Sequence, residues 1–161
     1  SPRPTNTSIP SRTPRPSFTP DMTKTLAPTA TVVPTSKPLA FSEAAYVKFI
    51  QTELDSTNID VRSVRVADGR ANGGVRGVII TYVTVGVREE DFKTEWETLF
   101  TRTASALKTN NLDVDEVSII VGLVNGKASS ILVAQIKDLR DFHNNAITRD
   151  EFFRRLTVTS F

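Results

Sequence analysis

The sequence predicts an α+β fold for residues 39–161, preceded by a spacer at residues 1–38. The first observation behind this prediction is that all nine prolines of the 161-residue chain lie between Pro2 and Pro38. The second is that one amphipathic helical pattern followed by two strand-like segments occurs twice in the remaining residues. The third is a sequence similarity between these two halves, which indicates a duplicated α-β-β unit.

The spacer is defined by its composition. Residues 1–38 contain nine Pro, nine Thr and five Ser, with few apolar side chains. Such a segment cannot bury enough apolar surface to offset the entropy lost on ordering, so we expect it to be disordered and biased towards polyproline II. The composition resembles the Thr/Pro-rich spacers of bacterial lipoproteins and cell-surface proteins. This resemblance implies an extracytoplasmic domain that is secreted, displayed on the cell surface or anchored to a membrane.

Charge divides the chain at the same place. Five basic residues and one acidic residue give the spacer a net charge of +4, which leaves −2 for residues 39–161. The folded part therefore lacks the basic surface that nucleic-acid binding requires, and we expect no nucleic-acid partner. The basic spacer is instead suited to contact an anionic membrane or cell-envelope polymer.

The sequence begins at Ser1, has no apolar run long enough for a membrane helix, and contains no cysteine. We expect that an export signal or anchor has been removed, and that any membrane attachment runs through that anchor. The absence of cysteine excludes disulfides and thiolate metal sites.

The first half of the domain, at about 41–87, opens with a helix. Ser42 is the expected N-cap, and Phe41 is placed to pack on Tyr46 as a hydrophobic staple. Two strand-like segments follow the helix, and a glycine-rich loop joins them.

The second half, at about 89–136, repeats this order. Its helix begins in the acidic run Glu89-Glu90-Asp91, which suits the positive end of a helix dipole. Asn125-Gly126 between the next two strands favours a two-residue hairpin turn. We expect the two helices to pack on one face of a four-stranded, mainly antiparallel sheet.

The evidence for duplication is a match at the helix-to-strand junctions. Residues of the first junction recur 53 positions later with the same spacing: Leu54, Asn58, Asp60, Val61 and Val64 match Leu107, Asn111, Asp113, Val114 and Val117. The leucines are expected in the core and the Asn and Asp residues in turns. A symmetric pair of ligand-binding aspartates, Asp60 and Asp113, is an alternative hypothesis.

Apolar residues occupy both faces of the predicted strands, whereas a solvated face would alternate with polar residues. The helices cover one face, so the other needs a cover from the C-terminal segment or from a second subunit. The predicted interaction surface combines apolar residues of two strands with two phenylalanines near the C-terminus: Val78, Ile80, Tyr82, Ile120, Phe152 and Phe153.

Residues 137–158 are expected to form short helices. Thr148 and Glu151 form a capping box, and Ile147 is placed to pack on Phe152. The motif Ile147-Thr148-x-x-Glu151-Phe152 is similar to the short C-terminal helical hairpin found on many bacterial proteins, although Asn144-Asn145-Ala146 stands where glycine is usual. The resemblance implies association.

Two arginines are the candidate ligand contacts of the glycine-rich loop. Arg70 and Arg76 would contact an anion or other ligand if this loop binds one. The loop leads into a strand and not into a helix, so it lacks the geometry of a phosphate-binding loop. We interpret it first as a hairpin connection.

The sequence nominates no catalytic residue, cofactor or metal site. His143 is the only histidine, and no nucleophile motif accompanies it. Asp141, His143 and Asn145 have the spacing of a calcium-loop start, but Ala146 stands where that loop requires glycine.

The leading hypothesis is therefore a non-enzymatic extracytoplasmic domain that binds a protein partner or forms a homodimer. The alternative is a carrier of a small hydrophobic ligand, with a cavity lined by Phe92, Trp96 and Phe100. A hydrolytic enzyme is a third hypothesis, for which no residues can be named.

Overall fold

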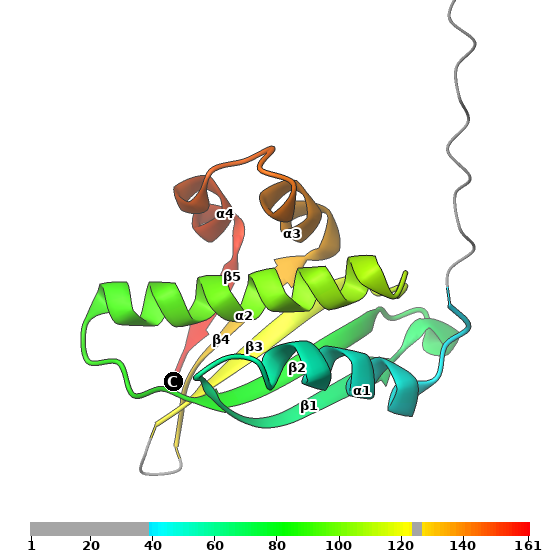
Figure 1. The fold of residues 1–161 in the computed structure, drawn as a ribbon, viewed down its shortest axis with the longest axis horizontal. Coiled ribbons are helices and arrows are strands. Elements are labelled where there is room, and N and C mark those ends of the chain that lie inside the picture. The colour runs from blue at the N-terminus through cyan, green and yellow to red at the C-terminus, as the bar shows by residue number, and fades with distance from the viewer. Residues whose placement is uncertain (1–38, 124–126) are drawn as a thin grey trace, which may run out of the picture. The chain divides into compact units, whose positions relative to one another are not determined.

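The computed structural model describes residues 39–123 and 127–161. The predicted spacer and the predicted Asn125-Gly126 turn lie outside these residues. The described chain is an α+β fold whose sheet has five strands, with four α-helices and one short 3-10 helix, η1 (Figure 1). In chain order the elements are α1 (Glu43–Leu54), β1 (Asp60–Asp68), η1 (Arg70–Asn72), β2 (Arg76–Val83), α2 (Glu89–Thr109), β3 (Glu116–Gly122), β4 (Ala128–Gln135), α3 (Ile136–His143), α4 (Arg149–Arg155) and β5 (Thr157–Ser160).

The sheet is mixed, which corrects the prediction of a four-stranded, mainly antiparallel sheet. Its strand order is β1-β2-β3-β4-β5. The β1–β2, β3–β4 and β4–β5 pairs are antiparallel, but β2 and β3 run parallel. The parallel pair follows from the long α2 crossover, which returns the chain to the end of the sheet at which β2 began. The fifth strand begins at Thr157, within the segment 137–158 that was expected to be helical.

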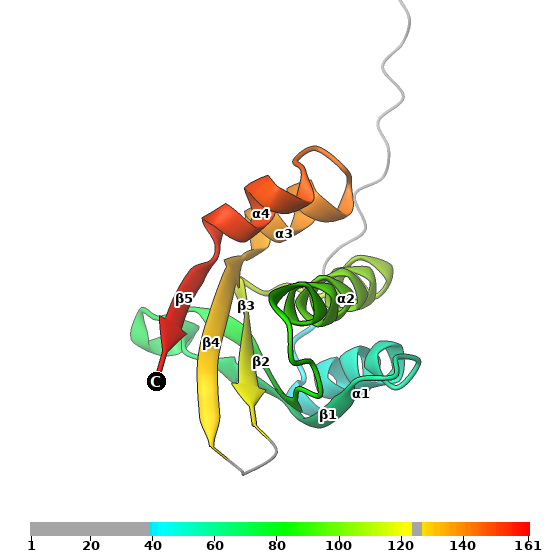
Figure 2. The ribbon, with the colours of Figure 1, turned by 90° about the vertical axis from the view of Figure 1, so that its left-hand side faces the viewer.

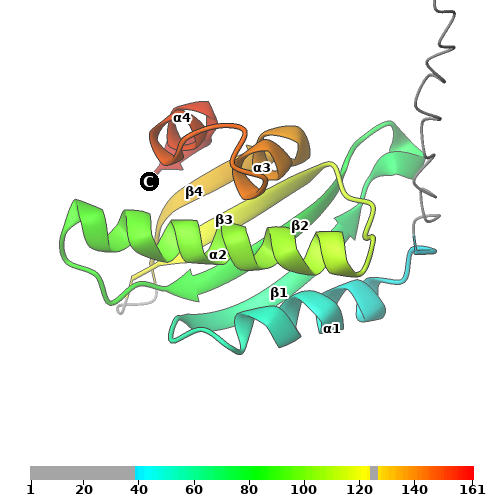
Figure 3. The same ribbon diagram turned by 45° about the horizontal axis from the view of Figure 1, so that its top comes forward.

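The sheet order also bears on the predicted duplication. Each half contributes a helix and an antiparallel β-hairpin, and both helices lie on the same face of the sheet (Figure 3). Because β2 and β3 are parallel neighbours, however, the two hairpins turn in opposite directions when viewed from the helices. Units of opposite hand cannot be superposed, so the two halves are not copies of one fold. Of the matched residues, Leu54 and Leu107 are both buried in the core, as predicted.

The core lies between the sheet and the helix layer. Strand residues that point to the helices are buried, among them Val78, Ile80, Val117, Ile119 and Leu132, and they pack with apolar side chains of α1 and α2. The predicted start of α1 is confirmed. Ser42 Oγ accepts a hydrogen bond from the Ala45 amide, and the rings of Phe41 and Tyr46 meet edge to face at 5.2 Å.

The C-terminal helices pack on α2 and leave the opposite face of the sheet open. Phe152 of α4 is fully buried, with its ring 5.2 Å from Phe100 and stacked at 4.4 Å on Phe142. The predicted capping box of α4 is confirmed in one half, because Thr148 Oγ1 accepts from the Glu151 amide at 3.2 Å, while the Glu151 carboxylate binds Arg155. All four helices lie on one side of the sheet, as Figure 2 shows. Within the described residues, the expected C-terminal cover of the second face is therefore not formed.

Candidate functional site

The uncovered side of the sheet, which we call the open face, is lined by β-branched residues of the three central strands. The strand registers place the following side chains there: Ile79, Thr81 and Val83 of β2, Ser118 and Ile120 of β3, and Ile131 and Val133 of β4. Each of these side chains is partly exposed. Ile120 pairs directly with Ile131, and Val133 follows two residues along β4. Ser118 separates Ile79 from Val133.

Charged side chains stand only around the edge of this apolar centre. Arg65 of β1 is in register with Ile79, and Glu116 begins β3. Thr157 and Thr159 of β5 continue the face on the opposite side. The open face thus has an apolar centre with a polar border, the usual arrangement of a protein interface.

The predicted interaction surface is divided between the two sides of the sheet. Val78, Ile80 and Tyr82 are fully buried under the helices, while Ile120 lies on the open face. The four residues were predicted to share one face because the sequence alone gives no register between β2 and β3. The parallel pairing aligns Val78 with Val117 and Ile80 with Ile119, so Ile120 shares a face with the odd-numbered residues of β2.

The two C-terminal members of the predicted surface are also core residues. Phe152 is fully buried, and Phe153 is partly buried with its ring edge to face with Trp96 at 6.4 Å. They hold α4 to α2 and are not available to a partner.

The hydroxyl of Tyr82 lies in the core near Glu95 of α2. Burial and the charge of Glu95 raise the pKa of Tyr82 above its ordinary value. The Glu95 carboxylate in turn accepts a hydrogen bond from Thr84 Oγ1 at 2.7 Å, so this polar group is held in place by its own chain.

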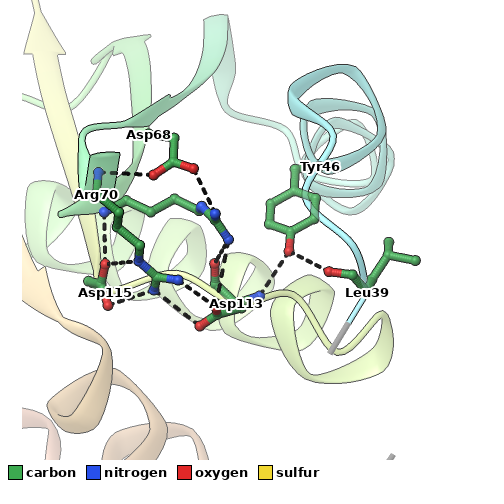
Figure 4. Close-up of polar contacts among 7 residues, drawn as sticks. Leu39, Tyr46, Asp68, Arg70, Asp113 and Asp115 are labelled. Carbon is green, nitrogen blue, oxygen red and sulfur yellow. Dashed lines mark hydrogen bonds and ion pairs between the residues drawn. The ribbon is translucent and has the colours of Figure 1, made fainter. Parts of the chain in front are cut away.

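Arg70 and Arg76, the predicted anion contacts, are occupied by aspartates of this domain (Figure 4). Arg70 makes paired hydrogen bonds with Asp115 at 2.7 and 2.8 Å, and also binds both carboxylate oxygens of Asp113. Arg76 binds Asp68 at 2.6 Å and the Asp113 carbonyl at 3.1 Å. Three carboxylates thus surround two guanidinium groups, and this Arg–Asp cluster fastens the β1–β2 loop to the start of β3.

Gly73 gives the loop the shape that this cluster needs. It follows η1 with a φ of 75°, a left-handed conformation that glycine adopts without strain. The glycine-rich sequence therefore serves the turn between β1 and β2, as the hairpin interpretation predicted.

The proposed pair of ligand-binding aspartates is not brought together. Asp60 pairs with Val83 at one end of the sheet and forms an ion pair with Arg62. Asp113 belongs to the cluster at the other end, next to the start of β2. The Asp113 amide also donates to the Tyr46 hydroxyl, which itself donates to the Leu39 carbonyl (Figure 4).

The Arg–Asp cluster makes the free energy of unfolding depend on pH. Hydrogen bonds from Arg70, and then from the Arg76 amide, lower the pKa of Asp115 to about 2. An unfolded aspartate has a pKa of about 3.9, so this contribution is complete above that pH and is lost as the pH falls towards 2. We expect Arg70→Gln to lower the free energy of unfolding at pH 7, with the difference from the unsubstituted protein shrinking between about pH 4 and 2. Urea titrations across this pH range measure the difference.

Arg154→Gln provides the control, since this exposed arginine has no ion pair in the described ranges. Its free energy of unfolding should differ little from that of the unsubstituted protein at every pH. An Arg70→Gln difference that stayed constant from pH 7 to pH 2.5 would contradict the assigned role of Asp115.

The aromatic residues proposed to line a ligand cavity are packed on other side chains. Phe92 stacks on Trp96 at 6.3 Å, Trp96 meets Phe153, and Phe100 is fully buried against Phe152. They form the contact between α2 and α4. The cleft between α2 and α3 is lined by other residues.

A cleft of about 310 Å³ lies between the C-terminal half of α2 and α3. Five apolar side chains form its floor: Ala104, Leu107, Leu112, Ile136 and Leu139. We call it the α2–α3 cleft. This cleft could not be predicted, because the periodicity of the sequence does not indicate where α3 packs on α2.

No metal site is found in the part of the chain that the structure describes, since no three His, Asp or Glu side chains there are grouped to hold an ion. His143 ends α3 at the edge of the α2–α3 cleft and is partly buried. Among residues 39–123 and 127–161, no helix has both the length and the apolar character needed to cross a membrane.

Comparison of the chain with protein-family models, curated proteins and solved structures found no match.

Proposed function

We propose that this domain is a non-enzymatic interaction module that associates with a second copy of itself through the open face of its sheet. The observation that carries the proposal is that one whole face of a five-stranded sheet has an apolar centre and no cover from the described residues. Covering such a face removes apolar surface from water, which favours association.

The composition of the open face fits a second sheet. Ile79, Ile120, Ile131 and Val133 are β-branched, and side chains of this kind interdigitate where two sheets pack about 10 Å apart. The central strands contribute no charge to the middle of the face, so two copies can meet without burying an unpaired ion. Arg65 and Glu116 at the border supply opposite charges that can set the rotation of one copy on the other.

The size of the face suggests modest affinity. Strands of this length, spaced about 4.8 Å apart, give a face of roughly 600 Å² in projection. Two such faces bury on the order of 1,200 Å², the lower end of the range for specific interfaces. We therefore expect a reversible dimer with a dissociation constant in the micromolar range.

The test is the mass of residues 1–161 by light scattering across a concentration series. The unsubstituted chain should shift from monomer to dimer, and Ile120→Lys should remain monomeric because it places an ammonium group in the centre of the contact. Val85→Lys is the matched control: it adds the same charge at an apolar side chain that is 78% exposed in the β2–α2 loop, and it should dimerise normally. A monomer at all concentrations up to the millimolar range would refute self-association.

We further propose that the domain acts outside the cytoplasm, displayed on its Thr/Pro-rich spacer. The spacer composition, with nine Pro and nine Thr among 38 residues, supports this location, and the absence of cysteine is compatible with it. Digestion of intact cells with an added protease tests this location. The protease should remove the domain's epitope from the cells, and a domain that is digested only after the cells are lysed would contradict the proposal.

A further inference from the structure

The geometry points to a second site on this domain: the α2–α3 cleft is a binding site for a small amphipathic carboxylate. This site is independent of the proposed association, because α2 and α3 lie on the side of the sheet opposite to the open face (Figure 2). Its ligand would have an apolar body and one anionic group.

The cleft has room for the apolar body. Its volume of about 310 Å³ is at the lower end of the range of roughly 300–1,000 Å³ for small-molecule sites. Of the apolar lining residues, Ile136 is partly exposed, whereas Leu107, Leu112 and Leu139 are almost fully buried and offer little accessible surface. A short alkyl chain placed there displaces water from apolar surface.

The rim of the cleft carries positive charge without a matching negative one. Lys108, Arg140 and His143 line the opening, and none of its ten lining residues is acidic. Within the described residues, no hydrogen bond or ion pair holds the Arg140 side chain, and Lys108 donates to the neutral Asn144 side chain at 3.2 Å. An incoming carboxylate can therefore use the Arg140 guanidinium without breaking an existing ion pair.

Acidic residues of the same helix do not cancel this charge. Asp141 is bound by Lys137 at 2.8 Å, and Asp138 is bound by Arg155 at 2.8 Å. Each of these carboxylates already has a cation of its own. The positive charge of Lys108 and Arg140 consequently remains available at the cleft.

The negative partial charges at the C-terminal ends of the helices repel an anion, but they are smaller than the positive charges of the side chains. Both α2 and α3 end at the cleft, and each C-terminus contributes a partial charge of about −0.5. Lys108 and Arg140 together contribute two full positive charges. Two full charges exceed the two partial ones, so the carboxylate is expected beside Lys108 and Arg140 at the rim and the apolar body inside.

The test uses three probes that share an alkyl chain and differ in charge: octanoate, octanol and octylammonium, all below their micelle concentrations. They are titrated into the ¹⁵N-labelled full chain while the amide NMR signals are followed. Octanoate should shift the signals of Ala104, Leu107 and Leu139. It should bind about tenfold more tightly than octanol, since a hydrogen bond to a charged group is worth about 1.5 kcal/mol or more. Octylammonium should bind most weakly.

Variants separate the two parts of the site. Arg140→Gln keeps the exposed surface and should reduce octanoate binding about tenfold while leaving octanol binding unchanged. Ala104→Leu fills the floor of the cleft and should weaken both probes. Arg154→Gln removes an exposed arginine away from the cleft and should change neither, and Ile120→Lys on the open face should bind octanoate normally.

The proposal fails if octanoate binds no better than octanol and octylammonium, or if its signal shifts fall outside the cleft. It also fails if none of the three probes shifts the cleft signals at millimolar concentration. Failure in any of these ways leaves the proposed association of the open face untouched, and a monomeric protein that binds octanoate would reject only the association.

Discussion

Phe152→Ala is expected to lower the free energy of unfolding by about 3–5 kcal/mol, a large part of the roughly 5–15 kcal/mol that stabilises a typical domain. The ring is fully buried and contacts three others: it stacks on Phe142, meets Phe100 edge to face and lies 5.8 Å from Phe153. Its removal leaves a cavity between α2, α3 and α4 that the short α4 cannot close without moving. Urea unfolding followed by circular dichroism measures the loss.

The substitution also tests whether α4 and β5 unfold with the rest of the domain. Trp96 is the chain's only tryptophan, and its ring contacts Phe153 of α4, so its fluorescence reports on this contact. In Phe152→Ala we expect the fluorescence transition to precede the loss of circular dichroism, since β5 joins the sheet directly after α4.

Phe161→Ala is the control for the loss of an aromatic ring, because Phe161 is 75% exposed. Its effect should stay within about 0.5 kcal/mol. A Phe152→Ala variant that unfolds within about 1 kcal/mol of the unsubstituted protein would show that the aromatic cluster contributes little to holding α4.

Local signals in the sequence predicted the helices well. The Ser42 cap, the staple of Phe41 on Tyr46 and the acidic start of α2 all lie within one or two turns of the residues they affect. Such features follow from neighbouring residues alone, and the structure confirms them.

The sheet could not be predicted in the same way. The parallel pairing of β2 with β3 joins residues almost 40 positions apart, such as Val78 and Val117, and no short motif specifies it. For the same reason the α2–α3 cleft could not be predicted. One signal was present: neither Lys108 nor Arg140 has an acidic residue three or four positions away, which leaves both without a helical ion-pair partner.

The Thr157–Ser160 strand illustrates a different failure. Its sequence, Thr-Val-Thr-Ser, has the β-branched residues of a strand but is only four residues long. Such a segment has little preference in isolation, and its structure depends on the edge of β4, with which Val158 pairs at Leu132. The capping box before it favoured reading the whole segment as helical.

A pair of neighbouring substitutions in β2 tests the assignment of the two faces. Ile80→Asp places a carboxylate in the core, at a residue with no exposure to solvent. We expect a loss of more than about 4 kcal/mol and an unfolded or partly folded protein, since an ionised side chain buried without a partner is among the most damaging changes a core can receive. Amide NMR dispersion and circular dichroism report the loss directly.

Ile79→Asp makes the same chemical change one residue earlier, on the open face. The carboxylate there reaches water, so the fold should be kept at a cost of about 1 kcal/mol, the span of strand preference. The same variant should prevent dimerisation, because pairing would bury its charge next to Ser118 and Thr81 of the open face. If both variants folded equally well, the register of β2 and β3 would be wrong. If Ile79→Asp folded and still formed dimers, the open face would not be the surface through which two copies meet.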